Sequence, residues 1–210
     1  LKQAKFTANI QLLTPPPPAT TDNFSLPPTT NATISGHWKK GDASFVDLHT
    51  LSIDSTPLLS NVRVFFNTAT LQQWRITTPT LPVDSTRKLL PFLPEGELKQ
   101  LFSSLHLQGN LRNFNLTWDN SKPLIERMQL QANADNISSG HWEGVPAFTG
   151  VSGYVQSGIG YGFIDLNSNN GFSMHYPEVY HQPIVFQRAA GRVQWQWQPD
   201  QKTVLVGSDY

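Results

Sequence analysis

Apolar residues occupy every second position in many short segments of this chain. They alternate with polar or charged residues in "NVRVFFN" (61–67), "RMQLQANAD" (127–135) and "RVQWQWQ" (192–198). This period of two is typical of β-strands with one buried face and one wet face. Turn-forming residues separate such segments at "DNSKP" (119–123), "NSNNG" (167–171) and "QPDQK" (198–202). Because no strand–helix alternation is present, the pattern predicts a mainly β fold built as an antiparallel meander.

A glycine-rich stretch, "VQSGIGYGFIDL" (155–166), follows the same period. A dinucleotide-binding loop would need a glycine where Phe163 stands and a helix after it, and the sequence has neither. We therefore predict a hairpin that turns at Ser157–Gly158. Its large side chains, Ile159, Tyr161 and Phe163, should share one face, and the glycines should take the other.

Two segments interrupt the strand pattern. The stretch "TPPPPATTDNFSLPPTTNAT" (14–33) has polyproline character and predicts an exposed excursion between two strands. Helical spacing of leucine and phenylalanine after Pro94 predicts a helix over 94–105, with Gly109 able to end the element. A shorter helical turn is expected around 87–90.

The chain begins without Met and runs directly into an alternating segment. We therefore expect a single fragment of a longer protein. We expect N-terminal strands over 1–86 with the Pro/Thr-rich loop at 14–33, a helical segment over 87–109, and C-terminal strands over 110–210.

The composition disfavours several classes of function. Fifteen basic and fifteen acidic residues balance, and only 14% of residues are charged, so nucleic-acid binding is disfavoured. The absence of cysteine excludes thiolate chemistry and disulfides. The six histidines show no metal-binding spacing, and Tyr154 stands where a nucleophile elbow needs its second glycine. The residues themselves therefore show no catalytic constellation and no metal-binding motif.

Six tryptophans lie in or beside the expected strands. They could fill a β core, form platforms that stack against sugars, or line a path for lipid. A sugar site would also need charged and amide groups close to the rings, and charges are thinly spread here. This favours apolar cargo.

Two long stretches of the C-terminal half carry a further set of motifs. They are "LPEGELKQLFSSLHLQGNLRNFNLTW" (93–118) and "GVPAFTGVSGYVQSGIGYGFIDLNSNNGFSMHYPEVYHQPIVFQRAAGRVQWQW" (144–197). Over residues 90–197 they resemble the central region of the AsmA-like envelope proteins of Gram-negative bacteria. The positions that match the family pattern are Pro94, Gly109, Pro146, Gly150, Gly153, Gly160, Asp165, Leu166, Pro177, Tyr180, Pro183, Gly191, Val193 and Trp195. Tyr180 replaces an expected phenylalanine, and the segment 14–33 is not part of that pattern.

The resemblance implies a strongly curved, open, taco-like sheet with one or two short helices. It implies a segment of a periplasmic, bridge-like lipid transfer protein that conducts phospholipids between the inner and outer membranes. Parts outside this chain would anchor the protein in the inner membrane. It also implies a protein that is not an enzyme and uses no metal or cofactor, with acyl chains as its ligand. Apart from the resemblance, a segment cut from a longer sheet has raw edges that could pair as an edge-to-edge dimer. We expect the groove to be lined by Leu111, Phe114, Leu116, Trp118, Met128, Leu130, Ala132, Ile159, Tyr161, Phe163, Val193, Trp195 and Trp197.

The alternative is a closed β-sandwich that binds polysaccharide or a protein partner in the cell envelope. The two hypotheses differ in one structural respect. A lipid path needs an apolar face that stays open, whereas a sandwich seals that face inside its core.

Overall fold

The computed structural model describes residues 2–13, 29–40, 44–53, 56–67, 72–86, 106–141, 146–198 and 203–209. Its strands form a single antiparallel sheet of thirteen strands that does not close on itself. No helix in the described ranges is long and apolar enough to cross a bilayer. The predicted antiparallel meander is therefore confirmed, and among the described strands none forms a second layer that would make a sandwich.

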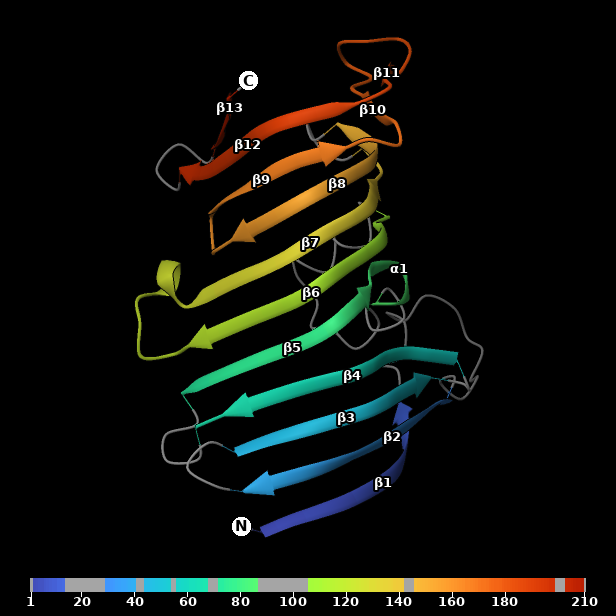
Figure 1. Cartoon of the computed structure of the whole chain (residues 1–210), viewed down its shortest axis with the longest axis vertical. Helices are drawn as coiled ribbons and strands as arrows, with labels where there is room; N and C mark the ends of the chain where they lie inside the picture. Colours follow the sequence, from blue (N-terminus) through green and yellow to red (C-terminus); the bar gives the residue numbers. More distant parts are fainter. Residues whose placement is uncertain are drawn as a thin grey trace, which may run out of the picture.

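Nine strands follow one another as sheet neighbours in chain order, from β1 to β9, and the sheet then continues through β12 to β13 (Figure 1). The short strands β10 and β11 leave this path: β10 pairs with β8, and β11 pairs with β10. The strands are β1 (Lys2–Leu13), β2 (Thr29–Lys40), β3 (Ser44–Ile53), β4 (Thr56–Phe66), β5 (Gln73–Pro82), β6 (Gln108–Asp119), β7 (Met128–Ser139), β8 (Ala147–Ser157), β9 (Tyr161–Ser168), β10 (Phe172–His175), β11 (Ile184–Phe186), β12 (Ala189–Gln198) and β13 (Thr203–Asp209). The described helices are α1 (Val83–Thr86) and the 3₁₀ turn η2 (Leu124–Glu126).

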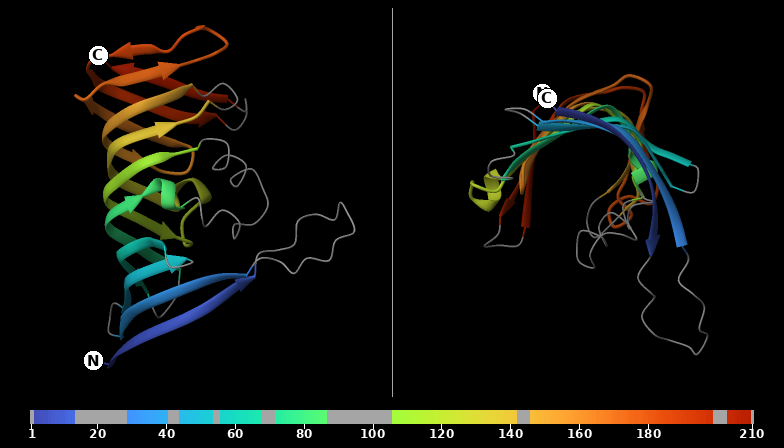
Figure 2. Two further views of the ribbon diagram at one scale, coloured as in Figure 1. Left: turned by 90° about the vertical axis from the view of Figure 1, so that its right-hand side faces the viewer. Right: turned by 90° about the horizontal axis from the view of Figure 1, so that it is seen from below.

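The sheet is bent into an arch. Seen along its long axis, the long strands cross the arch from one limb to the other, which leaves a concave inner face and a convex outer face (Figure 2). Helix α1 lies on the inner side of the arch and contacts β4 and β6. Because Val83 of α1 packs against the buried cluster that contains Ala134 of β7, the side chains that share a face with Ala134 belong to the concave face.

Local kinks allow the strands to follow this curve. Asn61, Asn113 and Asn136 have positive φ angles of 54°, 51° and 55°, a conformation that asparagine tolerates better than most residues. The pairing of β6 with β7 shifts register between Arg112 and Asn115, beside one of these kinks. Such bulges bend a strand and increase its twist, so they shape the arch.

Among the described residues, a packed cluster lies beneath the concave face on one limb. Ala134, Ile137 and Val151 form a small buried cluster there. Val83 of α1 and Phe172 of β10 pack against this cluster and cover it from inside the arch. The limb that holds α1 is thus filled, and the described part of the opposite limb has no comparable cover.

The structure differs from two detailed predictions made from the sequence. The segment 14–33 was predicted as an excursion, but Thr29–Thr33 belong to β2 and pair with β1. Gly109 was expected to end a helix, yet it lies inside β6, where a Cβ would come within 2.5 Å of the backbone oxygen of Asn136. The helices predicted over 94–105 and 87–90 lie outside the described residues.

Candidate functional site

One row of side chains crosses the concave face from β1 to β13. Its members are cross-strand partners in register, one from each successive strand of the main sheet path: Ala4, Trp38, Val46, Val64, Ile76, Leu116, Leu130, Ser157, Gly162, Trp195 and Val206. We call this set the apolar row, because only Ser157 and Gly162 are not apolar. At the usual spacing of about 4.8 Å between strands, the row extends about 48 Å along the long axis of the molecule.

Further apolar residues flank the row on the same face. Toward the strand ends at residues 66, 73, 119 and 128, the register aligns Phe66, Trp74, Trp118 and Met128. Toward the middle of the arch, it places Phe114, Ala132, Val155, Ile164 and Val193 on the same face. Together with the apolar row, these residues form what we call the apolar strip.

The strip is deepest in the middle of the arch and accessible near the strand ends. Phe114 and Ala132 are 8% and 1% exposed, whereas Leu116, Leu130 and Trp118 are only half-buried. Within the described ranges, no second sheet covers these half-buried side chains. This site is therefore a continuous apolar surface that remains open to a ligand.

The two non-apolar members of the row do not interrupt it with unmet hydrogen bonds. The Ser157 hydroxyl is within hydrogen-bond distance of the backbone oxygens of Gly158 and Tyr161, at 3.1 and 3.3 Å. The indole of Trp195 lies over Gly162, because a Cβ at Gly162 would stand 2.4 Å from Cζ2 of that ring. An aromatic ring that shields a cross-strand glycine in this way keeps the face apolar.

Most of the predicted groove residues share the concave face. By register, nine of the thirteen positions lie on it: Leu111, Phe114, Leu116, Trp118, Met128, Leu130, Ala132, Val193 and Trp195. A tenth, Trp197, has a side chain outside the described part of the structure. Leu111 packs on the filled limb against the Ala134 cluster. The predicted groove comprised only residues of the later strands. The concave face also holds Val64, Phe66, Trp74 and Ile76, and the alternation in 61–67 indicates two of them.

The other three residues require a correction. Ile159 lies in the turn between β8 and β9 and not in a strand. Phe163 pairs with Gln156 and Gln194, so it lies on the convex face, and Tyr161 shares that face. The glycine at position 162 faces inward because Trp195 occupies the space above it. The bulky face of β9 therefore points outward.

The convex face carries charged and polar side chains, and arginines cover the rings of Phe163 and Phe65 on it. The guanidinium of Arg192 lies 4.3 Å from the ring centroid of Phe163 and binds both oxygens of Asp165, at 2.6 and 2.8 Å. This hydrogen bonding to Arg192 lowers the pKa of Asp165. The guanidinium of Arg75 lies 4.5 Å from the ring centroid of Phe65. Cation–π contacts of this kind shield rings that would otherwise be exposed on the outside of the arch.

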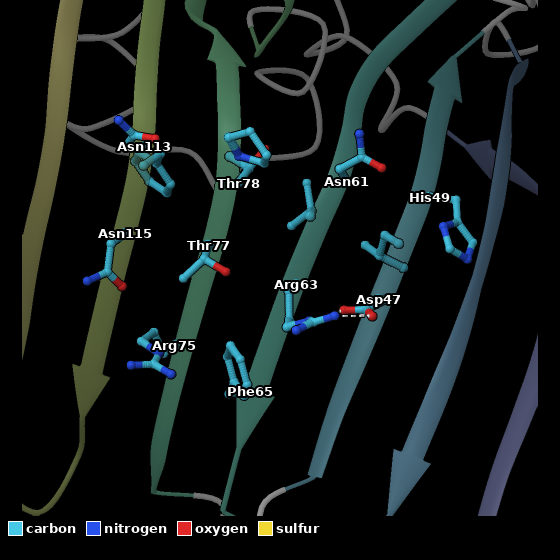
Figure 3. A pocket seen from close by; sticks show the side chains of 14 residues that line it. Asp47, His49, Asn61, Arg63, Phe65, Arg75, Thr77, Thr78, Asn113 and Asn115 are labelled. Carbon is cyan, nitrogen blue, oxygen red and sulfur yellow. Dashed lines mark hydrogen bonds and ion pairs between the residues drawn. The ribbon is translucent and has the colours of Figure 1, made fainter.

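A polar hollow of about 790 Å³ lies on this convex face over β3, β4, β5 and β6 (Figure 3). Arg63 binds the carboxylate of Asp47 there through two hydrogen bonds, which lower the pKa of Asp47. Nε2 of His37 lies 3.1 Å from the same carboxylate, and Nδ1 of His37 lies 3.3 Å from Nε2 of His49. Within the described residues neither imidazole hydrogen-bonds to a hydroxyl group, so the histidine–carboxylate contact lacks a nucleophile. The described residues also contain no cluster of three or more side chains suited to a metal ion.

Comparison with protein-family models matches residues 30–209 to the family described as YhdP protein. No curated protein and no solved structure matches the chain. The family match spans β2 to β13 and so includes nearly the whole apolar row. It agrees with the resemblance to the central region of YhdP and other AsmA-like envelope proteins.

Proposed function

Because the chain belongs to the YhdP protein family, a family of Gram-negative envelope proteins, we propose that it is a segment of a bridge-like lipid transfer protein. Phospholipids would pass between the inner and outer membranes with their acyl chains on the apolar strip. The protein would act in the periplasm, with its anchor in the inner membrane outside this chain. It would use no cofactor and break no covalent bond.

The observation that supports this proposal most directly is the unbroken apolar row. Eleven successive strands each place one member of the row on the inside of the same arch. A site for one small ligand would need several side chains that converge on a single point. A row that runs across every strand of the main sheet path instead offers equivalent contacts along its whole length, which suits a ligand that moves.

The energetic need for such a path is large. Exposure of each methylene group to water costs about 0.8 kcal/mol, so a sixteen-carbon chain that crosses water costs about 13 kcal/mol. Half-buried leucine, isoleucine, valine and tryptophan side chains remove most of that cost. They also hold the chain only by non-directional contacts, so neighbouring positions along the row differ little in free energy.

Photo-crosslinking tests the proposal. A photoreactive amino acid at Leu116 or Leu130 should capture phospholipid in living cells, because both side chains lie on the concave strip. The same residue at Thr117 or Gln129 serves as a matched control, since this partnered pair lies on the convex face of the same two strands. Lipid adducts should form at least severalfold more often at the first pair.

Equal capture at all four positions would contradict a path restricted to the concave face. Protein that carries no lipid at any position, and that is also empty in native mass spectrometry, would contradict lipid conduction as a whole.

A further inference from the structure

Amide side chains are concentrated at the polar hollow of the convex face. Asn61 of β4 and Asn113 and Asn115 of β6 line it, together with Thr77 of β5. Figure 3 shows these side chains spaced around the hollow on three neighbouring strands. The volume of about 790 Å³ falls within the range of small-molecule sites. The hollow therefore offers several hydrogen-bonding groups to one ligand.

The kinks that bend the arch also place two of these amides. Asn61 and Asn113 have positive φ angles of 54° and 51°, and their strands, β4 and β6, lie on either side of β5. Asn113 is also where the pairing of β6 with β7 shifts register. Bulges often serve to direct a side chain toward a binding site. The two kinks thus position amide groups on opposite sides of the same hollow.

These amides are free to bind a ligand. Oδ1 of Asn115 is buried and has no hydrogen-bond partner. The side chains of Asn61 and Asn113 form no hydrogen bond to any residue in the described ranges. A buried acceptor without a donor is costly, so Asn115 favours a ligand that supplies a hydroxyl or N–H group.

One cation of the hollow is also uncommitted. Arg63 is hydrogen-bonded to Asp47, and His37 lies 3.1 Å from the same carboxylate. By contrast, Arg75 lies over the ring of Phe65 at 4.5 Å and forms no ion pair within the part of the chain that the structure describes. The ring orients this guanidinium without using its N–H donors. Arg75 can therefore bind an anionic group, while the charge of Asp47 is already compensated.

We propose that the polar hollow binds an acidic saccharide. The amides of Asn61, Asn113 and Asn115 hydrogen-bond to its hydroxyl groups, and Arg75 binds its carboxylate. Amides suit a sugar, because each amide can both donate a hydrogen bond to a hydroxyl group and accept one from it. An anion without hydroxyl groups would bind Arg75 but leave Oδ1 of Asn115 without a donor.

The fold gathers these groups on the face opposite the proposed lipid path. The register pairs Arg63 with Thr77 and Thr77 with Asn115, so three neighbouring strands present polar side chains together on the convex face. The adjacent residues Ile76 and Leu116 belong to the apolar row on the concave face. Saccharide binding is therefore independent of lipid conduction, and each can be tested without the other.

Calorimetric titration of the purified chain tests the proposal with two tetrasaccharides, one of β-1,4-linked glucuronic acid and one of β-1,4-linked glucose. They differ only at C6, which is a carboxylate in the first and a hydroxymethyl group in the second. The acidic tetrasaccharide should bind about three- to tenfold more tightly, as expected for a partly exposed charge-assisted hydrogen bond. Tetraglutamate, which has carboxylates but no hydroxyl groups, should bind more weakly than the acidic tetrasaccharide.

Two variants separate the charge from the amides. Arg75→Gln should remove the preference for the acidic tetrasaccharide and leave the affinity for the neutral one unchanged. Asn113→Gly should weaken the binding of both by about two- to tenfold, because glycine keeps the positive φ but removes the amide. Arg188→Gln and Asn136→Gly make the same changes away from the hollow, at an exposed arginine and at an asparagine with a φ of 55°. Neither control should alter either affinity.

Folded wild-type protein that binds neither tetrasaccharide, or that binds all three probes equally, would overturn the saccharide site and leave the proposed lipid path untouched. Equal weakening by Asn113→Gly and Asn136→Gly would contradict the placement of the site in the polar hollow.

Discussion

At the scale of single residues, the contact between Gly162 and Trp195 predicts a sharp difference between two glycines. In Gly162→Ala the new methyl group would stand 2.4 Å from the Trp195 ring and 2.7 Å from the backbone oxygen of Gln156. Overpacking of this kind should lower the free energy of unfolding by about 1–3 kcal/mol. Gly207→Ala, whose nearest neighbour would be 3.5 Å away, should be almost neutral. Chemical denaturation followed by tryptophan fluorescence measures both, and equal midpoints would contradict the packing described for Trp195.

The ion pair between Asp47 and Arg63 predicts that the free energy of unfolding decreases at acidic pH. Hydrogen bonding to Arg63 lowers the pKa of Asp47 in the folded protein, so the pair stabilises the fold fully above the ordinary aspartate pKa of about 3.9. This stabilisation is lost as the pH falls through the lowered pKa. Asp47→Asn should therefore reduce the free energy of unfolding at pH 7 by about 1 kcal/mol, since the pair is partly exposed.

The same variant should lose less stability than wild type between pH 5 and pH 2, as measured by urea denaturation at each pH. Asp135→Asn removes a more exposed carboxylate from its pair with Arg112 and provides the comparison. An acid profile of Asp47→Asn that parallels wild type would show that the Arg63 pair does not stabilise the fold.

Residue patterns predict which faces are apolar better than they predict how strands align. The alternation in 127–135 and 192–198 correctly indicated that Met128, Leu130, Val193 and Trp195 lie on apolar faces. For Phe163, alternation alone could not identify the face, because Gly162 and Phe163 are adjacent and either could point inward. Only the pairing of β9 with β8 and β12 places Phe163 outside.

At the scale of elements, the β10–β11 hairpin behaves as an attachment to the sheet and not as part of its main path. It pairs with β8 at only three positions, while Phe172 packs on the Ala134 cluster and stacks on Phe186 with centroids 5.8 Å apart. His141 and Glu178 add a contact of 3.1 Å. Short β10 and β11 could not be predicted from sequence, because three or four residues are too few to show a period.

Truncation of the two stacked rings should have unequal effects. Phe172→Ala removes a ring from the buried cluster and should cost about 2 kcal/mol of stability, below the range for a fully buried phenylalanine. Phe186→Ala removes the exposed partner, which is 40% accessible, and should cost less than half as much. Hydrogen exchange should show faster exchange over 172–186 in both variants, with β7 and β8 affected only by Phe172→Ala. Equal costs would contradict the packing of Phe172 on the cluster.

At the scale of the whole molecule, curvature and amphipathic character act together. The polar convex face keeps the outside of the arch in water, and the kinks at Asn61, Asn113 and Asn136 allow the strands to bend around an open interior. The sequence predicted the open, curved sheet only through its family resemblance. Composition and period alone allowed a sandwich equally well, because both folds use strands with one apolar face.

An unbroken row predicts that every position along it matters in the same way. A lipid that moves along the arch must pass each member in turn, so one charged side chain at any member should block the path. Val64→Glu, Leu116→Glu and Leu130→Glu should each reduce phospholipid transfer by about tenfold or more, because a charge next to an acyl chain costs at least 1.4 kcal/mol. Arg63→Gln and Thr117→Glu, on the convex face of the same strands, should leave transfer within about twofold, in keeping with the weak effects of surface charges. Transfer of labelled phospholipid between the two membranes of cells that produce each variant measures the effect, with circular dichroism of the purified chains as a check on folding. A graded response, in which a charge on β4 blocks transfer but one on β7 does not, would contradict a single path through the whole arch.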